Sequence, residues 1–192
     1  SKDGPHGLIA GMTGSGKSAL LITMLLSLAV HYSYEDVQFA MIDFKGGGAA
    51  ASLQQLPHMV AALSNLDTMH LSRALVSFQN ECLRRQRLLA EMSELSEDVI
   101  DDIQTYRNHL KQFPQFSKIA ELIIVVDEFA ELKKQRPDFL DDLISISRIG
   151  RSLGIHLVLC TQRPTGIISE EIWANCGFKI ALRVAEASDL QE

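Results

Sequence analysis

One stretch decides the fold class of this 192-residue chain: Gly11-Met12-Thr13-Gly14-Ser15-Gly16-Lys17-Ser18. It matches the phosphate-binding loop pattern G-x-x-x-x-G-K-S/T at every position. The apolar run His6–Ala10, typical of a strand, precedes the loop, and the apolar segment Lys17–His31, typical of a helix, follows it. Because a strand, this loop and a helix together form a nucleotide-binding unit, the sequence predicts a P-loop domain.

Each residue type in the loop has a role in binding a nucleotide. Gly14 and Gly16 let the backbone turn so that consecutive N–H groups face anionic oxygens, and the helix N-terminus adds its positive end. Lys17 is expected to contact the β- and γ-phosphates, and the Ser18 hydroxyl to complete the Mg²⁺ coordination shell. A glycine-rich turn without a ligand is the alternative. We therefore expect ATP and Mg²⁺ as cofactors, with the nucleotide bound by Gly11, Met12, Thr13, Gly14, Ser15, Gly16, Lys17, Ser18 and Ala19.

A second motif places two carboxylates, Asp127 and Glu128, directly after the apolar run Leu122–Val126. Open α/β sheets bind ligands at the carboxyl ends of their strands, so both side chains are expected near the loop. Asp127 suits Mg²⁺ ligation, and Glu128 suits the polarisation of an attacking water. The alternative for Glu128 is a solvated carboxylate at a strand end.

A third apolar run, His156–Thr161, also ends in polar residues. In P-loop ATPases that use a strand-end glutamate, an extra strand lies between the loop strand and the acidic strand. A polar residue at the tip of that strand contacts the γ-phosphate. Gln162 is the candidate for this contact and Thr161 the second choice, while an ordinary loop role for Gln162 is the alternative.

The rest of the chain alternates strand and helix patterns, which predicts an α/β fold with right-handed crossovers. Further strands are expected at Val37–Phe44, Met59–Leu63 and Phe178–Val184. Further helices are expected at Leu66–Glu91, Glu97–Gln112, Pro137–Leu153 and Glu170–Asn175. Phe178–Val184 alternates in polarity, which is typical of a strand near a sheet edge. Ser96 is the expected N-cap of the helix from Glu97. We find no internal linker and expect one domain over residues 1–192.

The composition argues against several classes of protein. Hydrophobic residues make up 46% and charged residues 22%, which is ordinary for a globular domain. No apolar run reaches the roughly 18 residues of a membrane span, and the polar start does not resemble a signal peptide. The three cysteines, Cys82, Cys160 and Cys176, have no metal-site spacing and are expected as free thiols. A net charge of −6 gives no overall attraction to nucleic acid.

Four motifs together resemble the FtsK/SpoIIIE motor family: Thr13–Ser18, Ile42–Gly48, Asp127–Leu132 and Gly154–Pro164. Three details are similar to the EssC/EccC (YukB) ATPases of type VII secretion, namely Lys45–Gly48, Leu56–His58 and Arg148–Gly154. The resemblance extends from Gly4 to about Ser188. It implies a RecA-like P-loop NTPase fold, with a mainly parallel sheet flanked by helices on both faces.

The same resemblance implies a motor that couples ATP hydrolysis to the export of small helical-hairpin proteins of the WXG type. It implies a cytoplasmic module of a larger, membrane-anchored bacterial protein with several such domains in tandem. Neighbouring ATPase domains, in a hexameric ring of the full assembly, are the expected partners. Contact with the membrane is expected only through other parts of the parent protein, and nucleic acid is not expected as a partner. An FtsK-like DNA-translocating ATPase and a non-hydrolysing nucleotide-binding docking module are the alternatives.

Arg148 and Arg151 lie three positions apart near the end of the predicted helix Pro137–Leu153. FtsK-like motors carry an arginine three positions before the turn that starts here at Gly154, and this arginine completes the site of an adjacent subunit. The resemblance therefore implies a catalytic role for Arg151 in trans. Favourable placement of a cation at a helix C-terminus is the alternative.

Three further groups have two interpretations each. Asp43 either supports the loop and Mg²⁺ or is a structural aspartate at a strand end, and Lys45 either contacts a neighbour or belongs to a flexible glycine turn. Arg84, Arg85 and Arg87 are interpreted as a solvated helix face, because Glu81 and Glu91 flank them, with nucleic-acid contact as the alternative.

Overall fold

The computed structural model describes residues 5–44, 48–64, 68–162 and 170–183. Six strands form one sheet in the order β3-β2-β4-β5-β1-β6, and every neighbouring pair described is parallel. The strands are β1 (His6–Ala10), β2 (Val37–Asp43), β3 (Met59–Ser64), β4 (Glu121–Asp127), β5 (Ile155–Thr161) and β6 (Cys176–Ala181). This sheet confirms the predicted α/β fold. It also confirms the extra strand, since β5 lies between the loop strand β1 and the acidic strand β4, and the edge position of β6.

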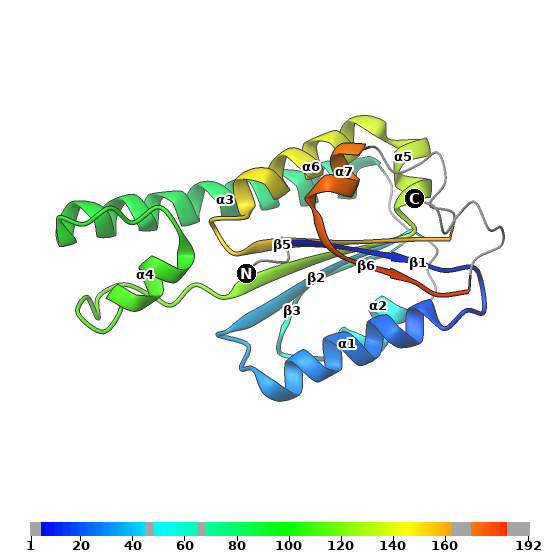
Figure 1. Cartoon of the computed structure of the whole chain (residues 1–192), viewed down its shortest axis with the longest axis horizontal. Helices are drawn as coiled ribbons and strands as arrows, with labels where there is room; N and C mark the ends of the chain where they lie inside the picture. The colour runs from blue at the N-terminus through cyan, green and yellow to red at the C-terminus, as the bar shows by residue number, and fades with distance from the viewer. Residues whose placement is uncertain (1–4, 45–47, 65–67, 163–169, 184–192) are drawn as a thin grey trace.

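Helices cover both faces of the sheet, as Figure 1 shows. One face carries α1 (Lys17–His31) and α2 (Ala49–Leu53). The opposite face carries α3 (Thr68–Ser96), α5 (Phe129–Gln135), α6 (Pro137–Gly150) and α7 (Glu170–Asn175). The short helix α4 (Ile103–His109) lies beyond the sheet, beside the C-terminal half of α3.

The sheet separates two hydrophobic cores, and alternate residues of each central strand enter opposite cores. In β2, Ala40 and Ile42 pack with the α3–α6 side, whereas Phe39 and Met41 pack with the α1–α2 side. Because both faces are buried, such a strand is a continuous apolar run, and its first polar residue marks the carboxyl end. That is why the strand ends could be placed from the sequence.

Several helices differ from the predictions: α3 ends at Ser96 and not at Glu91, and α6 ends at Gly150 and not at Leu153. The helix expected from Glu97 is wrong at its start, because α3 continues through Ser96 and α4 begins at Ile103. The N-cap is Asp102 in place of Ser96: its Oδ1 accepts hydrogen bonds from the backbone N–H groups of Gln104 (2.7 Å) and Thr105 (2.8 Å). The short helices α2 and α5 were not predicted. Each is too short to show a helical periodicity in the sequence, and each is stabilised by buried side chains, Ala49, Ala50 and Leu53 in α2 and Phe129 and Leu132 in α5.

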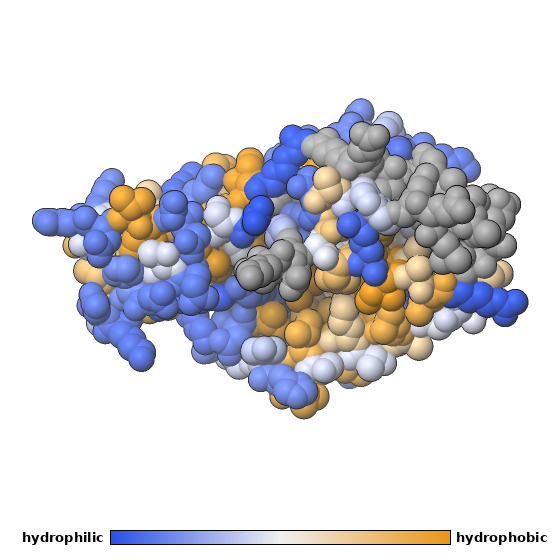
Figure 2. Space-filling model, viewed as in Figure 1, coloured by the Kyte–Doolittle hydropathy of each residue, from blue (hydrophilic) through white to orange (hydrophobic). Residues whose placement is uncertain are grey.

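Hydrophobic and hydrophilic residues are unevenly distributed over the surface. Figure 2 shows hydrophilic residues gathered around α4 and the end of α3, while hydrophobic residues gather over α1 and β6. Leu26 and Val30 of α1 and Phe178 of β6 are exposed there. An exposed apolar surface of this kind is typical of a contact region between proteins or domains.

A charged network joins the amino-terminal ends of the central strands. His156 Nε2 lies 2.9 Å from Glu121 Oε2, and His156 Nδ1 lies 2.8 Å from the carbonyl oxygen of Pro5. Arg107 donates a hydrogen bond of 2.5 Å to the other oxygen of Glu121. Both partners of the imidazole are acceptors, so both ring nitrogens donate when His156 is protonated. Burial acts to lower the pKa of His156, but the hydrogen bonds to Glu121 and Pro5 outweigh it and raise that pKa.

We expect this network to make the stability of the domain depend on pH. The pKa of His156 is higher in the folded than in the unfolded protein, so its contribution is fully present below the unfolded pKa of about 6.5. The contribution is lost as the pH rises through the folded pKa. Thermal unfolding of the wild type should therefore show a larger fall in Tm from slightly acidic to alkaline pH than unfolding of His156→Gln. Glu121→Gln should flatten the profile in the same way, and parallel profiles for all three proteins would contradict the assignment.

Candidate nucleotide-binding and catalytic site

The phosphate loop lies where the carboxyl ends of the central strands meet. It connects β1 to α1, and its backbone is tied to the strands on either side of β1. The N–H of Gly11 donates a 3.0 Å hydrogen bond to the carbonyl of Thr161, at the end of β5. The N–H of Met12 donates one of 2.9 Å to the carbonyl of Arg183, just beyond β6. These two hydrogen bonds attach the start of the loop to the ends of both neighbouring strands.

Three glycines of the loop serve two different purposes. Gly14 and Gly16 have φ angles of 79° and 90°, in the left-handed region that strains other residues. Gly11 instead permits a close approach, because a Cβ there would lie 2.5 Å from Ser15 Oγ and 3.1 Å from Leu182 Cβ. The sequence motif marks all three positions, but only the structure separates conformational need from lack of space.

Lys17, at the end of the phosphate loop, forms a buried ion pair with Asp127, at the end of β4. The ammonium group of Lys17 donates to Asp127 Oδ1, and only 6% of Lys17 and 5% of Asp127 is exposed. A buried charge left without a partner is strongly destabilising, so each of these residues stabilises the other. On binding of a nucleotide with its cation, a phosphate would replace Asp127 as the partner of Lys17, and the cation would replace Lys17 as the partner of Asp127.

The cleft beside this pair is lined by residues of the loop, of the start of α1 and of the two neighbouring strand ends. Its lining residues are Met12, Thr13, Gly14, Gly16, Lys17, Ser18, Ala19, Asp127 and Gln162. Ser18 and Asp127 thus offer a hydroxyl and a carboxylate, the hard oxygen ligands that Mg²⁺ prefers. Among the described residues, no three acidic, histidine or cysteine side chains surround one point. The donor set therefore fits an ion held by one or two protein oxygens together with substrate phosphates.

Glu128 lies in a strained and buried position next to the tip of β5. Its φ of 63° is left-handed, and among the described non-glycine residues only Glu97 shares this feature. Only 7% of Glu128 is exposed, and its Oε1 accepts hydrogen bonds from the N–H of Gln162 (3.2 Å) and the hydroxyl of Thr161 (3.4 Å). Strain of this kind is concentrated at functional sites. The alternative of a solvated carboxylate is wrong.

The two candidates at the end of β5 occupy different environments. Thr161 is fully buried and directs its hydroxyl at Glu128, whereas Gln162 lines the cleft. The side-chain amide oxygen Oε1 of Gln162 accepts a 3.0 Å hydrogen bond from the hydroxyl of Thr13 in the loop. Of the two candidates, only Gln162 thus lines the cleft, and its contact with Thr13 was not predicted from the sequence.

Asp43 is the last residue of β2, the strand beside β4. Asp43 is buried and stands opposite Asp127 in the register of the two strands. It thus adds a carboxylate to the same sheet edge as Asp127. Lys45 lies outside the described residues.

The arginines lie far from the cleft. Arg151 is exposed in the turn between α6 and β5, at the amino-terminal edge of the sheet. The seven residues of β5 separate it from Gln162, a distance of roughly 20 Å. Arg151 therefore cannot reach the cleft of its own domain. Arg148 is exposed in the last turn of α6.

The interpretation of the arginines on α3 as one solvated face is wrong for Arg85. Arg84 and Arg87 are exposed, and Arg84 pairs with Glu81. Arg85 is only 1% exposed and donates hydrogen bonds to backbone carbonyls of a distant turn. The cluster therefore does not form a basic patch.

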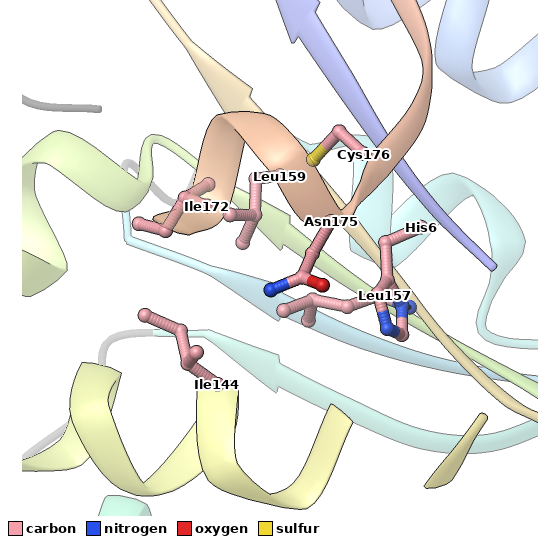
Figure 3. Close-up of a pocket in the computed structure, with 7 residues that line it drawn as sticks. All are labelled: His6, Ile144, Leu157, Leu159, Ile172, Asn175 and Cys176. Atoms are coloured by element: carbon pink, nitrogen blue, oxygen red, sulfur yellow. Dashed lines mark hydrogen bonds between the residues drawn. The ribbon is translucent and has the colours of Figure 1, made fainter. Parts of the chain in front are cut away.

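A second hollow, mostly apolar, lies between α6, α7 and the sheet (Figure 3). It is lined by His6, Ile144, Leu157, Leu159, Ile172, Asn175 and Cys176.

Burial raises the pKa of the Cys176 thiol to about 11 and that of Cys160 to about 12, so both stay protonated at neutral pH. All three cysteines are free thiols, as predicted, and a protonated thiol is a poor nucleophile.

Comparison with known proteins agrees with the geometry. The profile of the FtsK/SpoIIIE family matches residues 1–166. The type VII secretion system protein EssC of Staphylococcus aureus is 44% identical over 189 residues, which cover 98% of this chain and 12% of EssC. The cytoplasmic domain of the Thermomonospora curvata type VII secretion ATPase EccC superposes with a TM-score of 0.86 and 34% identity, over 98% of this chain and 22% of that one. A structure of ATPases 2 and 3 of the T. curvata protein, in complex with a signal sequence peptide, has a TM-score of 0.75 and 28% identity over 94% of this chain and 31% of that one.

These likenesses confirm the expected RecA-like fold and the resemblance to the EssC/EccC ATPases. The chain spans 12% of the length of the S. aureus relative, so it corresponds to a small part of that protein. None of the helices described here has the length and apolar character needed to cross a bilayer.

Proposed function

The chain belongs to the FtsK/SpoIIIE family, and we propose that it is an ATP-hydrolysing motor module of a type VII protein secretion system that exports small helical-hairpin proteins. The observation that carries the enzymatic part is the placement of Glu128, a buried carboxylate held beside Gln162 and the Lys17–Asp127 pair. The 44% identity to EssC supports the secretory part.

ATP binding rests on an exchange of partners in the cleft. The loop N–H groups and the N-terminus of α1 receive the phosphates, and Lys17 turns from Asp127 to the β- and γ-phosphates. Ser18 and Asp127 would hold Mg²⁺, which when bound neutralises charge on the phosphate oxygens. The exchange keeps Lys17 paired throughout, so the buried cation never stands alone.

Hydrolysis needs a water aligned with the γ-phosphate and a group to accept its proton. Glu128 is the base, because its carboxylate is buried and fixed by the N–H of Gln162. The Gln162 side chain contacts the γ-phosphate from the neighbouring strand end. Arg151 of an adjacent domain stabilises the charge that develops in the transition state.

The module works, on this proposal, as a cytoplasmic part of a larger membrane-anchored bacterial protein and next to other ATPase domains, in a hexameric ring of the full assembly. The T. curvata relative, which contains ATPases 2 and 3 and binds a signal sequence peptide, supports neighbouring domains and a peptide-bearing substrate. The exposed apolar side chains over α1 and β6 support a domain contact. WXG-type proteins are the proposed cargo, and the membrane is contacted only by other parts of the parent.

DNA binding separates this function from the main alternative, an FtsK-like DNA motor. We expect an assembled form of this domain to bind duplex DNA weakly and with little dependence on salt, because Arg85 is buried and Arg84 is paired with Glu81. A DNA motor that neutralises several phosphates would instead lose roughly 10³-fold or more in affinity between about 50 and 200 mM salt. Fluorescence anisotropy of labelled duplex DNA across this range measures the difference, and tight, steeply salt-dependent binding would favour the DNA motor.

Measurement of phosphate release from ATP distinguishes the proposed hydrolysing enzyme from the second alternative, a docking module that binds ATP without hydrolysing it. Steady turnover of ATP by an assembled form, lost on Glu128→Gln, is the expected result. Tight retention of ATP with no turnover by the wild-type assembly would favour the docking alternative.

A further inference from the structure

The guanidinium of Arg85 lies beneath the turn that carries Arg151. Arg85 Nη1 donates hydrogen bonds to the carbonyl oxygens of Leu153 (2.7 Å) and Gly154 (3.1 Å), 68 and 69 residues away in the sequence. Its Nε donates to Glu81 Oε1 at 2.7 Å, one turn back on α3. A single side chain thus connects the longest helix with the turn between α6 and β5.

The buried guanidinium is balanced by charge and by hydrogen bonds. Removing such an ion from water is costly unless a counter-ion and acceptors surround it. Glu81 is the counter-ion. Burial acts to raise the pKa of this carboxyl, but the hydrogen bonds from Arg84 and Arg85 hold it below its usual value. The planar fork of arginine reaches a carboxylate on one side and two carbonyls on the other, which the single ammonium of lysine does not match.

The backbone of the turn between α6 and β5 is restricted in conformation. Gly154 has a φ of 70°, and a Cβ there would lie 2.5 Å from Glu121 Oε2 and 2.6 Å from Ile103 Cδ1. Its carbonyl also accepts a 2.8 Å hydrogen bond from the N–H of Leu122 in β4. Earlier in the same turn, the carbonyl of Ser152 accepts a 2.8 Å hydrogen bond from the N–H of Ile103 in α4. The residues on the C-terminal side of Arg151 are therefore fixed, while its own side chain is exposed.

We propose that Arg85, supported by Glu81, is a positioning residue that holds this turn so that Arg151 is presented to the nucleotide of an adjacent subunit. The inference rests on the proposed role of Arg151 in trans. An arginine that acts on a transition state must be placed accurately, and a displacement of about 1 Å can reduce a rate by about 10²-fold. Arg85 does not touch the nucleotide of either subunit, so its effect is on geometry alone.

A fusion of two copies of this chain tests the proposal. The acceptor copy carries Arg151→Ala and keeps Glu128, and the donor copy carries Glu128→Gln and keeps Arg151. Only the interface at which the donor presents Arg151 to the acceptor has a complete site.

Arg85→Lys keeps the positive charge but loses the planar guanidinium and its several hydrogen-bond donors. This substitution is introduced into the donor copy in one fusion and into the acceptor copy in another. In the donor copy it should lower kcat for ATP by about 10- to 100-fold and leave KM unchanged. In the acceptor copy, whose turn has no Arg151 to present, turnover should not change.

Two further variants separate positioning from a general loss of stability. Glu81→Gln retains a hydrogen-bond acceptor for Arg85 and removes only the charge, so it should give a weaker loss with the same dependence on the copy. Arg84→Lys changes the other, exposed partner of Glu81, which does not contact the turn, and should have no effect in either copy. Equal losses from Arg85→Lys in the donor and the acceptor, or no loss in either, would overturn the positioning role. A parental fusion without turnover would instead overturn the role of Arg151, and the inference with it.

Discussion

Replacement of Lys17 by alanine is expected to abolish measurable ATP binding, whereas Glu128→Gln should bind Mg-ATP almost normally and fail to hydrolyse it. Lys17 is the cation at the bottom of the cleft. Hydrogen bonds to charged groups contribute about 1.5–3 kcal/mol each, so losing two phosphate contacts should weaken binding by roughly 10²- to 10⁴-fold. In Glu128→Gln the amide oxygen can still accept the hydrogen bond from the N–H of Gln162, and only the base is lost. Turnover should fall by about 10²- to 10⁴-fold.

Isothermal titration of both variants with Mg-ATP, together with phosphate release, measures this division of labour. Lys17→Ala also leaves the Asp127 carboxylate buried without its cation, which can cost about 3–5 kcal/mol of stability. The double variant Lys17→Ala/Asp127→Asn removes that charge and should recover thermal stability without recovering ATP binding. An equal loss of affinity in Lys17→Ala and Glu128→Gln would contradict the assigned roles.

The sequence predicted that the loop and the acidic pair lie at the same edge of the sheet, because each follows an apolar run that can be recognised locally. The apolar runs before Gly11 and Asp127 mark buried strands, and in a parallel sheet the residues after such strands meet at one edge. The place of β5 required more than a local pattern. It was predicted from the arrangement typical of P-loop ATPases with a strand-end glutamate, and β5 between β1 and β4 confirms it, whereas the positions of β2 and β3 were not predicted.

The sequence could not show the backbone of Glu128, because a left-handed, non-glycine residue leaves no mark in composition or periodicity. The burial of Arg85 did leave a signal. Phe78, Cys82, Leu89 and Met92 are buried on one stripe of α3, and Arg85 occupies the vacant position in their four-three spacing. The stripe could not reveal the acceptors of the Arg85 hydrogen bonds, since the carbonyls of Leu153 and Gly154 are 68 and 69 residues away in the sequence.

We expect turnover to return when two inactive variants, Glu128→Gln and Arg151→Ala, are forced together in one assembly. Arg151 lies at the edge of the sheet opposite its own cleft, with the length of β5 between them, so any contact with a nucleotide must be made in another subunit. An arginine supplied to a neighbouring site stabilises charge in the transition state and is worth about 10³–10⁵ in rate. Arg151→Ala alone should therefore lower turnover steeply in an assembled form while leaving ATP affinity nearly unchanged.

The rescue depends on one mixed interface. There, the Arg151→Ala subunit supplies Glu128 and the Glu128→Gln subunit supplies Arg151, so all the groups of one site are present. If Arg151 only stabilises the end of α6, no activity returns, and Arg151→Ala lowers the melting temperature instead. Normal unfolding and assembly of both variants, combined with no rescue, would thus exclude the role in trans.

The same mixture with Arg148→Ala in place of Arg151→Ala is the matched control, because Arg148 is an exposed arginine one helical turn earlier. Arg148→Ala alone should keep its activity, so a loss of turnover in that variant, recovered on mixing with Glu128→Gln, would assign the role to Arg148.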